Sequence, residues 1–294
     1  MIKRYYYYIK INFLSILDYI FGEWRRLGIK PKEIVVDLGC GGRPLPRADI
    51  IVDKFLTGFT ERPTDFIDNK AFIIQCDIDH LPFKNKSIDF VYSSHVIEHL
   101  NNPAICLNEM ERIGKRGYIT CPSALREQIM ALKMHLWFAE IKDNKIILFR
   151  KKQPYPEFIN NYFDKFLASE QSYIWHSFER SFRKEFFINY FWKNKINYVI
   201  HDLQNIQTWK IAGETEFQPE KNFLLSIRKS IIIFTSQTIK KIFSKQIDIE
   251  KILCCPNCHG NIKINDEFVF CEKCNEKYQH QDKRIFYFVQ KYDA

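Results

Sequence analysis

Ile34-Val35-Val36-Asp37-Leu38-Gly39-Cys40-Gly41-Gly42 decides the fold, because a short apolar strand here runs directly into a glycine-rich turn. A second apolar run, Ile50-Ile51-Val52-Asp53, also ends in an acid. Further apolar runs occupy residues 72–76, 88–92 and 117–121. Apolar runs that do not alternate with polar residues are typical of parallel strands covered on both faces. The sequence therefore predicts an α/β fold with a doubly wound (Rossmann-like), mostly parallel sheet.

The glycine-rich turn does not match the common phosphate-binding motifs. A Gly-x-Gly-x-x-Gly fingerprint that starts at Gly39 requires a third glycine at position 44, which is Pro44. Proline also lacks the backbone N–H that a phosphate-binding turn donates. The chain contains no Gly-Lys-Ser/Thr of a P-loop. What remains is a glycine turn with room for a ligand, between the strand-end acids Asp37 and Asp53.

The sequence after the fourth strand predicts one helix and an insertion. Apolar residues at helical spacing predict a helix over residues 96–113 with a break at Pro103. Asp143-Asn144 between two apolar runs predicts a hairpin inside an insertion at about 127–195. The aromatic-rich residues 155–195 are expected to be helical, either as core or as the wall of a substrate pocket. Strands near residues 198–203 and 207–212 are expected to close the sheet.

The 294-residue chain carries a formal net charge of +9. Such an excess can indicate a nucleic-acid or anionic-membrane partner, although a general bias toward Lys, Ile, Asn, Phe and Tyr explains it equally well. Asn12 and Asp18 interrupt the apolar stretch near the N-terminus, which favours an amphipathic helix over a signal peptide. Arg228 and Lys229 interrupt the most apolar later segment, so no transmembrane helix is predicted and we expect a cytoplasmic protein.

Four motifs in order resemble the class I S-adenosylmethionine-dependent methyltransferases, in the branch that acts on small molecules. Residues 35–42 look like the first motif of that family, and Asp53 matches the acid that holds the ribose hydroxyls. Residues 76–83 resemble its adenine loop, and residues 87–100 resemble its fourth strand with the helix that follows. The resemblance covers about residues 20–125. It implies S-adenosylmethionine as the cofactor and methyl donor.

The resemblance also implies a role for each polar residue of these motifs. Asp37 is expected near the methionine amino group, Asp53 at the ribose diol and Asp77 at the adenine amine. Carboxylates suit these positions because charged hydrogen bonds are roughly twice as strong as neutral ones. The residues expected to bind the cofactor are Asp37, Gly39, Cys40, Gly41, Asp53, Asp77, Ile78 and Ser94.

The turn departs from the family pattern in one respect. Arg43 stands where the family often has a third glycine, and Gly39 to Asp53 spans only 14 positions. Pro44 and Pro46 leave little room for a full helix there. We therefore expect the first helix to be shortened or replaced by a loop, which changes the cofactor contacts made by residues 42–43.

Transfer of a methyl group to a hydroxyl requires a proton acceptor. A positioned general base contributes about 100-fold or more to such a reaction. His95 lies at the C-terminal end of the fourth strand, where doubly wound sheets bind their ligands. We therefore predict His95 as a catalytic residue, with Glu98 and His99 as companions one helical turn later. The alternative is that His95 only shapes the cofactor site and that Glu98 and His99 are structural.

The motifs do not identify the acceptor. The aromatic insertion at 134–192 resembles methyltransferases of surface-polysaccharide or lipid-linked glycan assembly, which implies a hydroxyl of a glycan or small molecule as the acceptor. Basic and apolar residues interleave over 221–245. That pattern fits either a helix on the inner face of an anionic membrane or a linker helix with one packed face.

Two Cys-x-x-Cys pairs near the C-terminus, 12 residues apart, predict a closed tetrahedral zinc site. The predicted ligands are Cys255, Cys258, Cys271 and Cys274. A segment of 44 residues is too small to be stable through its own core, so the zinc is expected to be structural. The segment resembles a zinc-ribbon family that includes the activator subunit of several RNA and translation-factor methyltransferases. This implies a scaffold or partner-docking role, with Cys254 as a bystander.

Two other functions remain open on this basis. One is a methyltransferase directed at RNA or at a translation factor, with the ribbon as docking module and the +9 charge as its footprint. The other is a non-catalytic zinc adaptor with a methyltransferase-like fold. The predicted domains are 1–220, the methyltransferase domain; 221–250, a basic amphipathic linker helix; and 251–294, the zinc ribbon.

Overall fold

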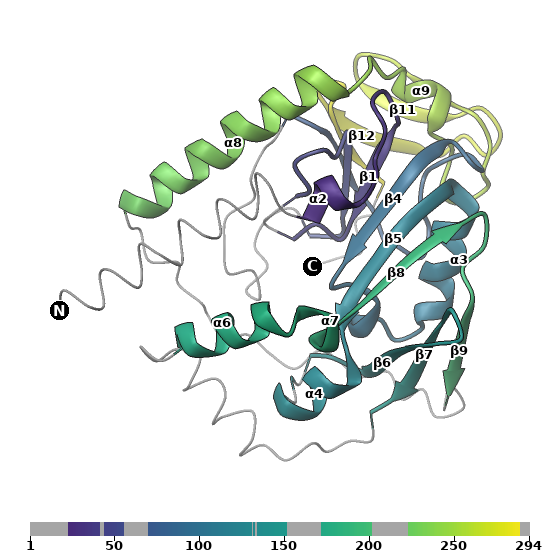
Figure 1. Cartoon of the computed structure of the whole chain (residues 1–294). Helices are drawn as coiled ribbons and strands as arrows, with labels where there is room; N and C mark the ends of the chain where they lie inside the picture. Colours follow the sequence, from purple (N-terminus) through teal and green to yellow (C-terminus); the bar gives the residue numbers. More distant parts are fainter. Residues whose placement is uncertain are drawn as a thin grey trace.

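The computed structural model describes residues 23–41, 44–55, 70–130, 132, 134–151, 172–201 and 223–288. Their dominant feature is a ten-stranded sheet with the order β10-β11-β12-β13-β3-β2-β1-β4-β5-β8 (Figure 1). Its parallel centre consists of β3 (Phe72–Gln75), β2 (Ile50–Asp53), β1 (Val35–Leu38), β4 (Ile88–Ser94) and β5 (Gly114–Pro122). The strand order reverses between β1 and β4, as in doubly wound sheets. The predicted fold class is confirmed.

Both faces of the central strands are buried, which explains their continuous apolar sequences. Val36 and Leu38 of β1 belong to a large apolar core that also contains Met110 of α3 (Pro103–Ile113). Val35 of the same strand faces a smaller core, which includes Leu27 from the turn after α2 (Glu23–Arg26). Successive side chains of a strand point to opposite faces, so a strand covered twice has no polar side to present to water.

The connections around the central strands follow the sequence closely. The predicted helix over 96–113 is a 3₁₀ turn, η1 (Ile97–His99), followed by α3, which begins at Pro103 with Asn102 as its N-cap. Proline is favoured in the first turn of a helix because its missing N–H would be unpaired there. The described part of the link from β1 to β2 contains turns and no helix, as expected; residues 42–43 lie outside the described ranges.

The strand that closes the sheet differs from the prediction. β8 (Phe187–Lys193) pairs antiparallel with β5 and forms that edge. The helical expectation for 155–195 is therefore wrong at 187–193; α6 (Ser172–Ser181) and α7 (Arg183–Phe186) are helices, and 155–171 lies outside the described residues. Every second residue of β8 is buried, and this alternation is the sign of a strand with one exposed face.

A second, three-stranded sheet contains the predicted hairpin. β6 (Trp137–Lys142) and β7 (Lys145–Arg150) pair antiparallel around Asp143-Asn144, and both turn residues have positive φ, as two-residue hairpin turns require. β9 (Tyr198–His201) pairs parallel with β7. The prediction that residues near 198–203 close the main sheet is therefore wrong, and residues 207–212 lie outside the described ranges. The remaining helix of this region is α4 (Ala124–Met130).

The C-terminal segment extends the main sheet. β10 (Ile262–Ile264), β11 (Phe268–Cys271), β12 (Lys277–Gln281) and β13 (Ile285–Tyr287) form an antiparallel series. β13 then pairs in parallel with β3, with Phe286 opposite Ile74. The short helix α9 (Ile249–Ile252) precedes the series, and its Ile252 carbonyl accepts a hydrogen bond from Lys84 N at 2.9 Å. Backbone hydrogen bonds thus join the segment after the predicted boundary at 251 to the main sheet and to the residues just before β4.

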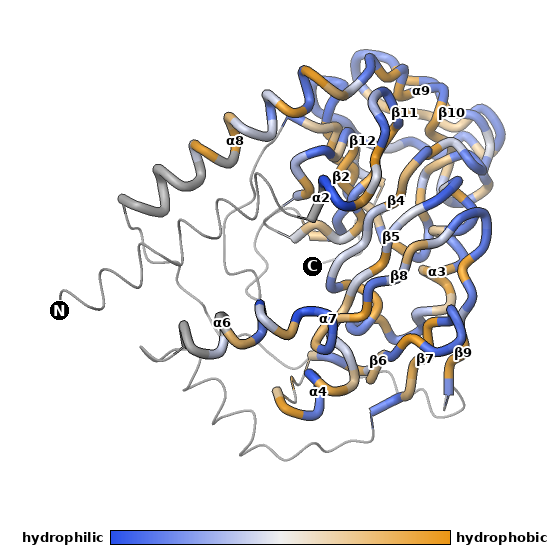
Figure 2. Tube along the Cα trace, in the orientation of Figure 1, coloured by the Kyte–Doolittle hydropathy of each residue, from blue (hydrophilic) through white to orange (hydrophobic). Residues whose placement is uncertain are grey.

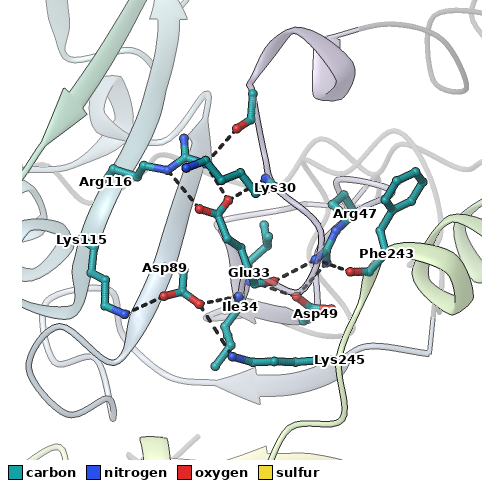
Figure 3. A network of polar contacts seen from close by, with 12 residues as sticks. Lys30, Glu33, Ile34, Arg47, Asp49, Asp89, Lys115, Arg116, Phe243 and Lys245 are labelled. Atoms are coloured by element: carbon teal, nitrogen blue, oxygen red, sulfur yellow. Dashed lines mark hydrogen bonds and ion pairs between the residues drawn. The ribbon is translucent and has the colours of Figure 1, made fainter.

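Helix α8 (Phe223–Phe243) precedes the C-terminal segment in the chain, and its C-terminal end meets the main sheet near β1 (Figure 1). The contact is made by Arg47, whose side chain is 1% exposed. Its guanidinium donates to the Asp49 carboxylate at 2.8 Å and to the Phe243 carbonyl at 3.1 Å, and it also reaches the Glu33 carbonyl (Figure 3). None of the helices in the described ranges combines the length and apolar character of a membrane span.

We predict that Arg47→Met destabilises the protein by about 3–5 kcal/mol, because it leaves the buried Asp49 carboxylate without its cation. Urea unfolding measures the change. Lys115→Met is the control, since Lys115 is 58% exposed in its ion pair with Asp89 and exposed pairs contribute at most about 1 kcal/mol. Equal effects of the two substitutions would contradict the assignment of Arg47 as the buried link between α8 and the sheet.

Candidate active site

Three aspartates lie where the first three parallel strands end. Asp37 is in β1, Asp53 ends β2, and Asp77 follows β3. The parallel register places Leu38 opposite Val52 and Asp53 opposite Gln75. Because parallel strands end at the same edge of a sheet, the three aspartates lie at the carboxyl edge, where doubly wound sheets bind their ligands. The structure therefore brings together the acids that the sequence singled out.

Asp37 is a buried carboxylate with one oxygen available. Its side chain is 1% exposed, and Oδ2 accepts a hydrogen bond from Leu45 N at 2.6 Å. Oδ1 is buried and has no hydrogen-bond partner among the described residues. Burial raises the pKa of the Asp37 carboxyl to about 7; the Leu45 N–H opposes this shift and the nearby Asp53 adds to it. A buried acceptor without a partner is costly unless a ligand supplies the donor.

The glycine turn after β1 is shaped by close packing. Gly39 has φ +67°, and a Cβ atom there would lie 2.4 Å from Cγ2 of Val96. Its N–H donates to the Val52 carbonyl at 2.8 Å, which fixes the turn against β2. Gly41 has φ +56° and donates its N–H to Asp53 Oδ2 at 3.0 Å. The turn and the second acid are thus directly joined.

Asp53 is positioned by two backbone N–H groups. Gly41 N binds one oxygen, and Phe55 N binds the other at 3.0 Å. Each bond holds one oxygen, so the pair of bonds orients the carboxylate at the end of β2. The Sγ atom of Cys40 lies 4.0 Å from Asp53 Oδ2, and the Cys40 side chain is partly exposed beside the turn.

Asp77 has a partner that the sequence did not reveal. Its Oδ2 pairs with Lys54 Nζ at 2.6 Å, while Oδ1 accepts from Asp79 N at 3.2 Å. Burial alone would raise the pKa of Asp77, but the Lys54 and Asp79 hydrogen bonds hold it below its ordinary value. Both ends of the Lys54 pair are about half exposed, so a ligand amine can replace or share it. Ile78 is half-buried next to it, against the large core.

Together these groups fit S-adenosylmethionine. Asp37 supplies a buried oxygen that needs a donor, Asp53 supplies a preset diol acceptor, and Asp77 offers an acceptor for an amine. The main chain at Gly41 is open, since no atom lies within 4 Å of the position of a Cβ atom. Ser94, the last residue of β4, is half-buried at the same edge. Residues 42–43, whose contacts were expected to depart from the family pattern, lie outside the described ranges.

His95 follows β4 directly. Its backbone has φ +58°, and its N–H donates to the Thr120 carbonyl at 2.9 Å. The imidazole is 45% exposed, with Nδ1 at 3.2 Å from Oε1 of the fully buried Glu98. The ring edge packs against Phe187, with ring centroids 5.5 Å apart. Positive φ in a non-glycine residue is uncommon, and it turns this side chain out of the strand line at the sheet edge.

Glu98, His99 and His135 lie next to His95 in this region. Burial alone would raise the pKa of Glu98, but His95, His99 and His135 lower it to about 2. His99 is largely buried, and burial lowers its pKa. Its ring stands edge-on to His135, with centroids 4.6 Å apart. His135 and its partner Glu127 were not predicted from the sequence, since they precede the hairpin, far from the strand ends in sequence.

The four predicted zinc ligands lie together. All four sulfur atoms are within 4.8 Å of one another, and the Cys255–Cys274 and Cys258–Cys271 pairs are 3.6 and 3.4 Å apart. Bonds of about 2.3 Å to a tetrahedral zinc imply sulfur separations of about 3.8 Å. The cluster is therefore compatible with zinc. Cys254 stands apart from it and donates its backbone N–H to the Pro82 carbonyl at 3.0 Å.

The family profile described as "Methyltransferase domain" matches residues 36–121. This stretch contains Asp37, Asp53, Asp77 and His95. Residues 36–121 are a methyltransferase domain. The match covers less than a third of the chain, and the insertion, α8 and the cysteine cluster lie outside it. No curated protein matches the chain.

Several solved structures resemble parts of the chain. A putative methyltransferase from Bacillus halodurans has 20% identity and a TM-score of 0.27 over 34% of this chain and 49% of its own. A possible histamine N-methyltransferase from Thermotoga maritima has 20% identity and a TM-score of 0.30, over 42% and 58%. A complex of the Haloferax volcanii Trm112 methyltransferase activator with a putative methyltransferase has 17% identity and a TM-score of 0.31. That match covers 51% of this chain and 80% of the matched chain. The chain spans about half the length of the first of them.

We predict that Asp37→Asn makes the cofactor-free methyltransferase domain more stable at neutral pH and weakens cofactor binding. The folded-state pKa of about 7 lies above the ordinary 3.8, so wild-type stability falls as pH rises from about 4 to about 7, and a neutral amide avoids this loss. Urea unfolding at pH 4.5 and pH 7.5 should show the stability difference between variant and wild type increasing with pH. A constant difference would contradict the buried, unpaired carboxylate.

Proposed function

We propose that the protein is an S-adenosylmethionine-dependent methyltransferase that methylates a hydroxyl of a small-molecule or glycan acceptor. The observation that carries this proposal is the buried Asp37 Oδ1, which has no hydrogen-bond partner among the described residues. It lies near the N–H-oriented Asp53, within the stretch that matches a methyltransferase domain. Buried carboxylate oxygens in folded proteins normally accept a hydrogen bond, so an oxygen that accepts none indicates a ligand that supplies the donor. The arrangement suits a ligand that carries an ammonium and a diol.

In this proposal each carboxylate binds one polar part of the cofactor. Asp37 accepts from the methionine ammonium, Asp53 from the ribose hydroxyls and Asp77 from the adenine amine, where Lys54 shares the carboxylate. Gly39 and Gly41 keep the backbone close to the ligand. When bound, S-adenosylmethionine supplies an electrophilic methyl group on a sulfonium, whose leaving thioether is neutral. The protein therefore needs to act mainly on the acceptor.

His95 is the proposed general base. Its imidazole is exposed at the end of β4, and Glu98 contacts Nδ1, which leaves Nε2 as the nitrogen that can take the acceptor proton. Glu98 is fully buried, so its proposed part is to orient His95 and to stabilise the imidazolium. His99, largely buried behind it, is placed to shape the same site.

The aromatic insertion supports a sugar-containing acceptor. The rings of Phe178 and Phe182 pack at an angle of 49°, with centroids 4.8 Å apart, and the two side chains are 44% and 45% exposed. Phe186 packs under Phe178, and Phe187 connects this cluster to His95. Exposed aromatic faces bind flat, apolar surfaces such as those of sugar rings. A methyltransferase directed at RNA or at a translation factor remains the alternative, with the cysteine-containing segment as its docking module and the +9 charge as its footprint.

We predict that His95→Ala lowers methyl transfer by about 100-fold or more while leaving cofactor affinity nearly unchanged. Radiolabelled S-adenosylmethionine, offered with lipid-linked glycans or with tRNA, measures transfer, and calorimetry with S-adenosylhomocysteine measures affinity. Asp53→Ala should abolish both. Unaltered turnover in His95→Ala would remove it from the mechanism, and transfer to tRNA alone would favour the alternative acceptor.

The C-terminal cysteines are proposed to bind a structural zinc ion that supports the adenine-binding loop. Leu253 forms a β-bridge with Phe83, and Cys254 N donates to the Pro82 carbonyl, so the first zinc knuckle is hydrogen-bonded to the loop that carries Asp77. This arrangement supports a scaffold role rather than one in catalysis, because four thiolates leave no position open on the metal.

We predict that zinc removal lowers cofactor affinity as well as stability. Without the zinc, residues 253–254 lose their contacts with residues 82–83. The loop that carries Asp77 is then held less firmly. A zinc-binding variant, Cys258→Ser, should weaken S-adenosylhomocysteine binding by calorimetry, and Cys254→Ser should not. An unfolded ribbon with unchanged cofactor affinity would contradict this coupling.

Helix α8 supports peripheral membrane contact. Hydrophobic residues recur along the coloured part of α8 (Figure 2). Phe234 and Ile242 are 72% and 66% exposed, and Ile231 is 37% exposed. At about 100° per residue these three side chains fall within about 80° of one another around the helix, next to the exposed Lys241. An exposed apolar stripe with flanking lysines fits the surface of an anionic bilayer.

We predict that the protein sediments with anionic vesicles at low salt and that Phe234→Ser/Ile242→Ser does not. Phe191→Ser is the control, since Phe191 is 52% exposed on β8, outside α8. If the wild type did not sediment, or if the double variant sedimented as the wild type does, α8 would be an ordinary linker helix without membrane contact.

A further inference from the structure

The residues behind His95 form a cluster of metal-ligand type. Glu98, His99 and His135 place one carboxylate oxygen and two ring nitrogens within 4.8 Å of one another. Glu98 comes from the 3₁₀ turn after β4 and His135 from the segment before β6, so the set is assembled by the fold. The Glu98 carbonyl accepts a hydrogen bond from Leu136 N at 2.7 Å, which holds the two segments together.

Glu98 supplies the observation that points to a ligand. Its side chain is fully buried, and neither carboxylate oxygen has a hydrogen bond with good geometry in the described residues; His95 Nδ1 lies 3.2 Å from Oε1. A buried carboxylate normally accepts two or more hydrogen bonds or binds a metal. Oε2 therefore lacks the partner that its burial requires.

His135 is oriented as metal-binding histidines are. Its Nδ1 is hydrogen-bonded to Oε1 of the buried Glu127, whose Oε2 pairs with Lys151. Metal-bound histidines typically donate their second ring nitrogen to a carboxylate, which fixes the tautomer and raises the basicity of the free nitrogen. This leaves Nε2 of His135 for a ligand, on a ring that Glu127 holds in place.

The charges of the cluster are also unbalanced. Glu98 and Glu127 contribute two negative charges, and Lys151 contributes one positive charge. Arg126 lies 3.8 Å from Glu127 but pairs more closely with Glu179. The Arg126–Glu179 pair is neutral and adds no net charge to the cluster. With neutral imidazoles the buried group carries one net negative charge, which a bound cation would offset.

We propose that Glu98, His99 and His135 bind a first-row divalent metal ion such as Mn²⁺, Fe²⁺, Co²⁺ or Zn²⁺. Two imidazoles and one carboxylate suit these ions and leave coordination positions open. The site is separate from the cysteine cluster, which offers sulfur ligands only. Its role rests on the proposed function: an ion here, bound by Glu98 beside His95, binds an oxygen of the acceptor and lowers the pKa of its hydroxyl. Acceptors with neighbouring hydroxyls would bind best.

The test is a titration of the zinc-loaded full chain with Co²⁺, without cofactor or acceptor. We expect one further equivalent of Co²⁺ per chain with weak visible absorption and no thiolate charge-transfer band, because the new ligands are nitrogen and oxygen. His135→Gln and Glu98→Gln should each weaken Co²⁺ binding by about 10–100-fold or more. Total metal content, measured by mass spectrometry, should fall from two equivalents to one.

His201→Gln is the matched control, because His201 is an exposed histidine of β9 outside the cluster. It should bind Co²⁺ as the wild type does. No additional equivalent in the folded wild type, or binding that both cluster variants retain, would overturn the proposal, and the wild-type titration decides even if a variant does not fold. Calorimetry with S-adenosylhomocysteine on the same samples reports cofactor binding independently, so failure of the metal site and failure of the methyltransferase proposal are distinguishable.

Discussion

The parallel pairing of β1 with β2 and β4 is the constraint on which the site depends. It fixes where each strand ends, and therefore where Asp37, Asp53 and the residues after β4 meet. The Gly39 N–H bonded to the Val52 carbonyl holds the turn against β2, and the Gly41 N–H bonded to Asp53 makes the turn part of the binding edge. A side chain at Gly39 would collide with Val96 and separate these groups.

The C-terminal segment depends on the same sheet. β13 adds to β3 in parallel register, and residues 253–254 bond to residues 82–83, so the cysteine cluster is built onto the edge that carries Asp77. Arg47 binds the end of α8 near the start of β1 (Figure 3). A few residues later, the Ile252 carbonyl of α9 accepts from Lys84 N, just before β4. The bonds of residues 253–254 to residues 82–83 therefore join the metal-binding segment to the loop that carries Asp77.

Local sequence signals predicted the parts of the fold that depend on local physics. The buried strands, the break at Pro103 and the turn at Asp143-Asn144 each follow from burial, proline geometry or turn geometry, and the structure confirms them. The partner of a strand is not a local property, so the sequence assigned β9 to the main sheet and did not predict that β8 forms its edge. For the same reason the sequence could not reveal Lys54 on Asp77 or the approach of His135 to Glu98, since each contact joins residues brought together by the whole sheet.

The most direct measurement is a crystal structure of the protein with S-adenosylhomocysteine. The account predicts the amino group of the ligand within hydrogen-bond distance of Asp37 Oδ1, the ribose hydroxyls on Asp53 and the adenine amine on Asp77. It also predicts that the sulfur faces His95. A ligand bound elsewhere, or a carboxyl edge where Asp37 Oδ1 keeps no partner after soaking, would contradict the central claim.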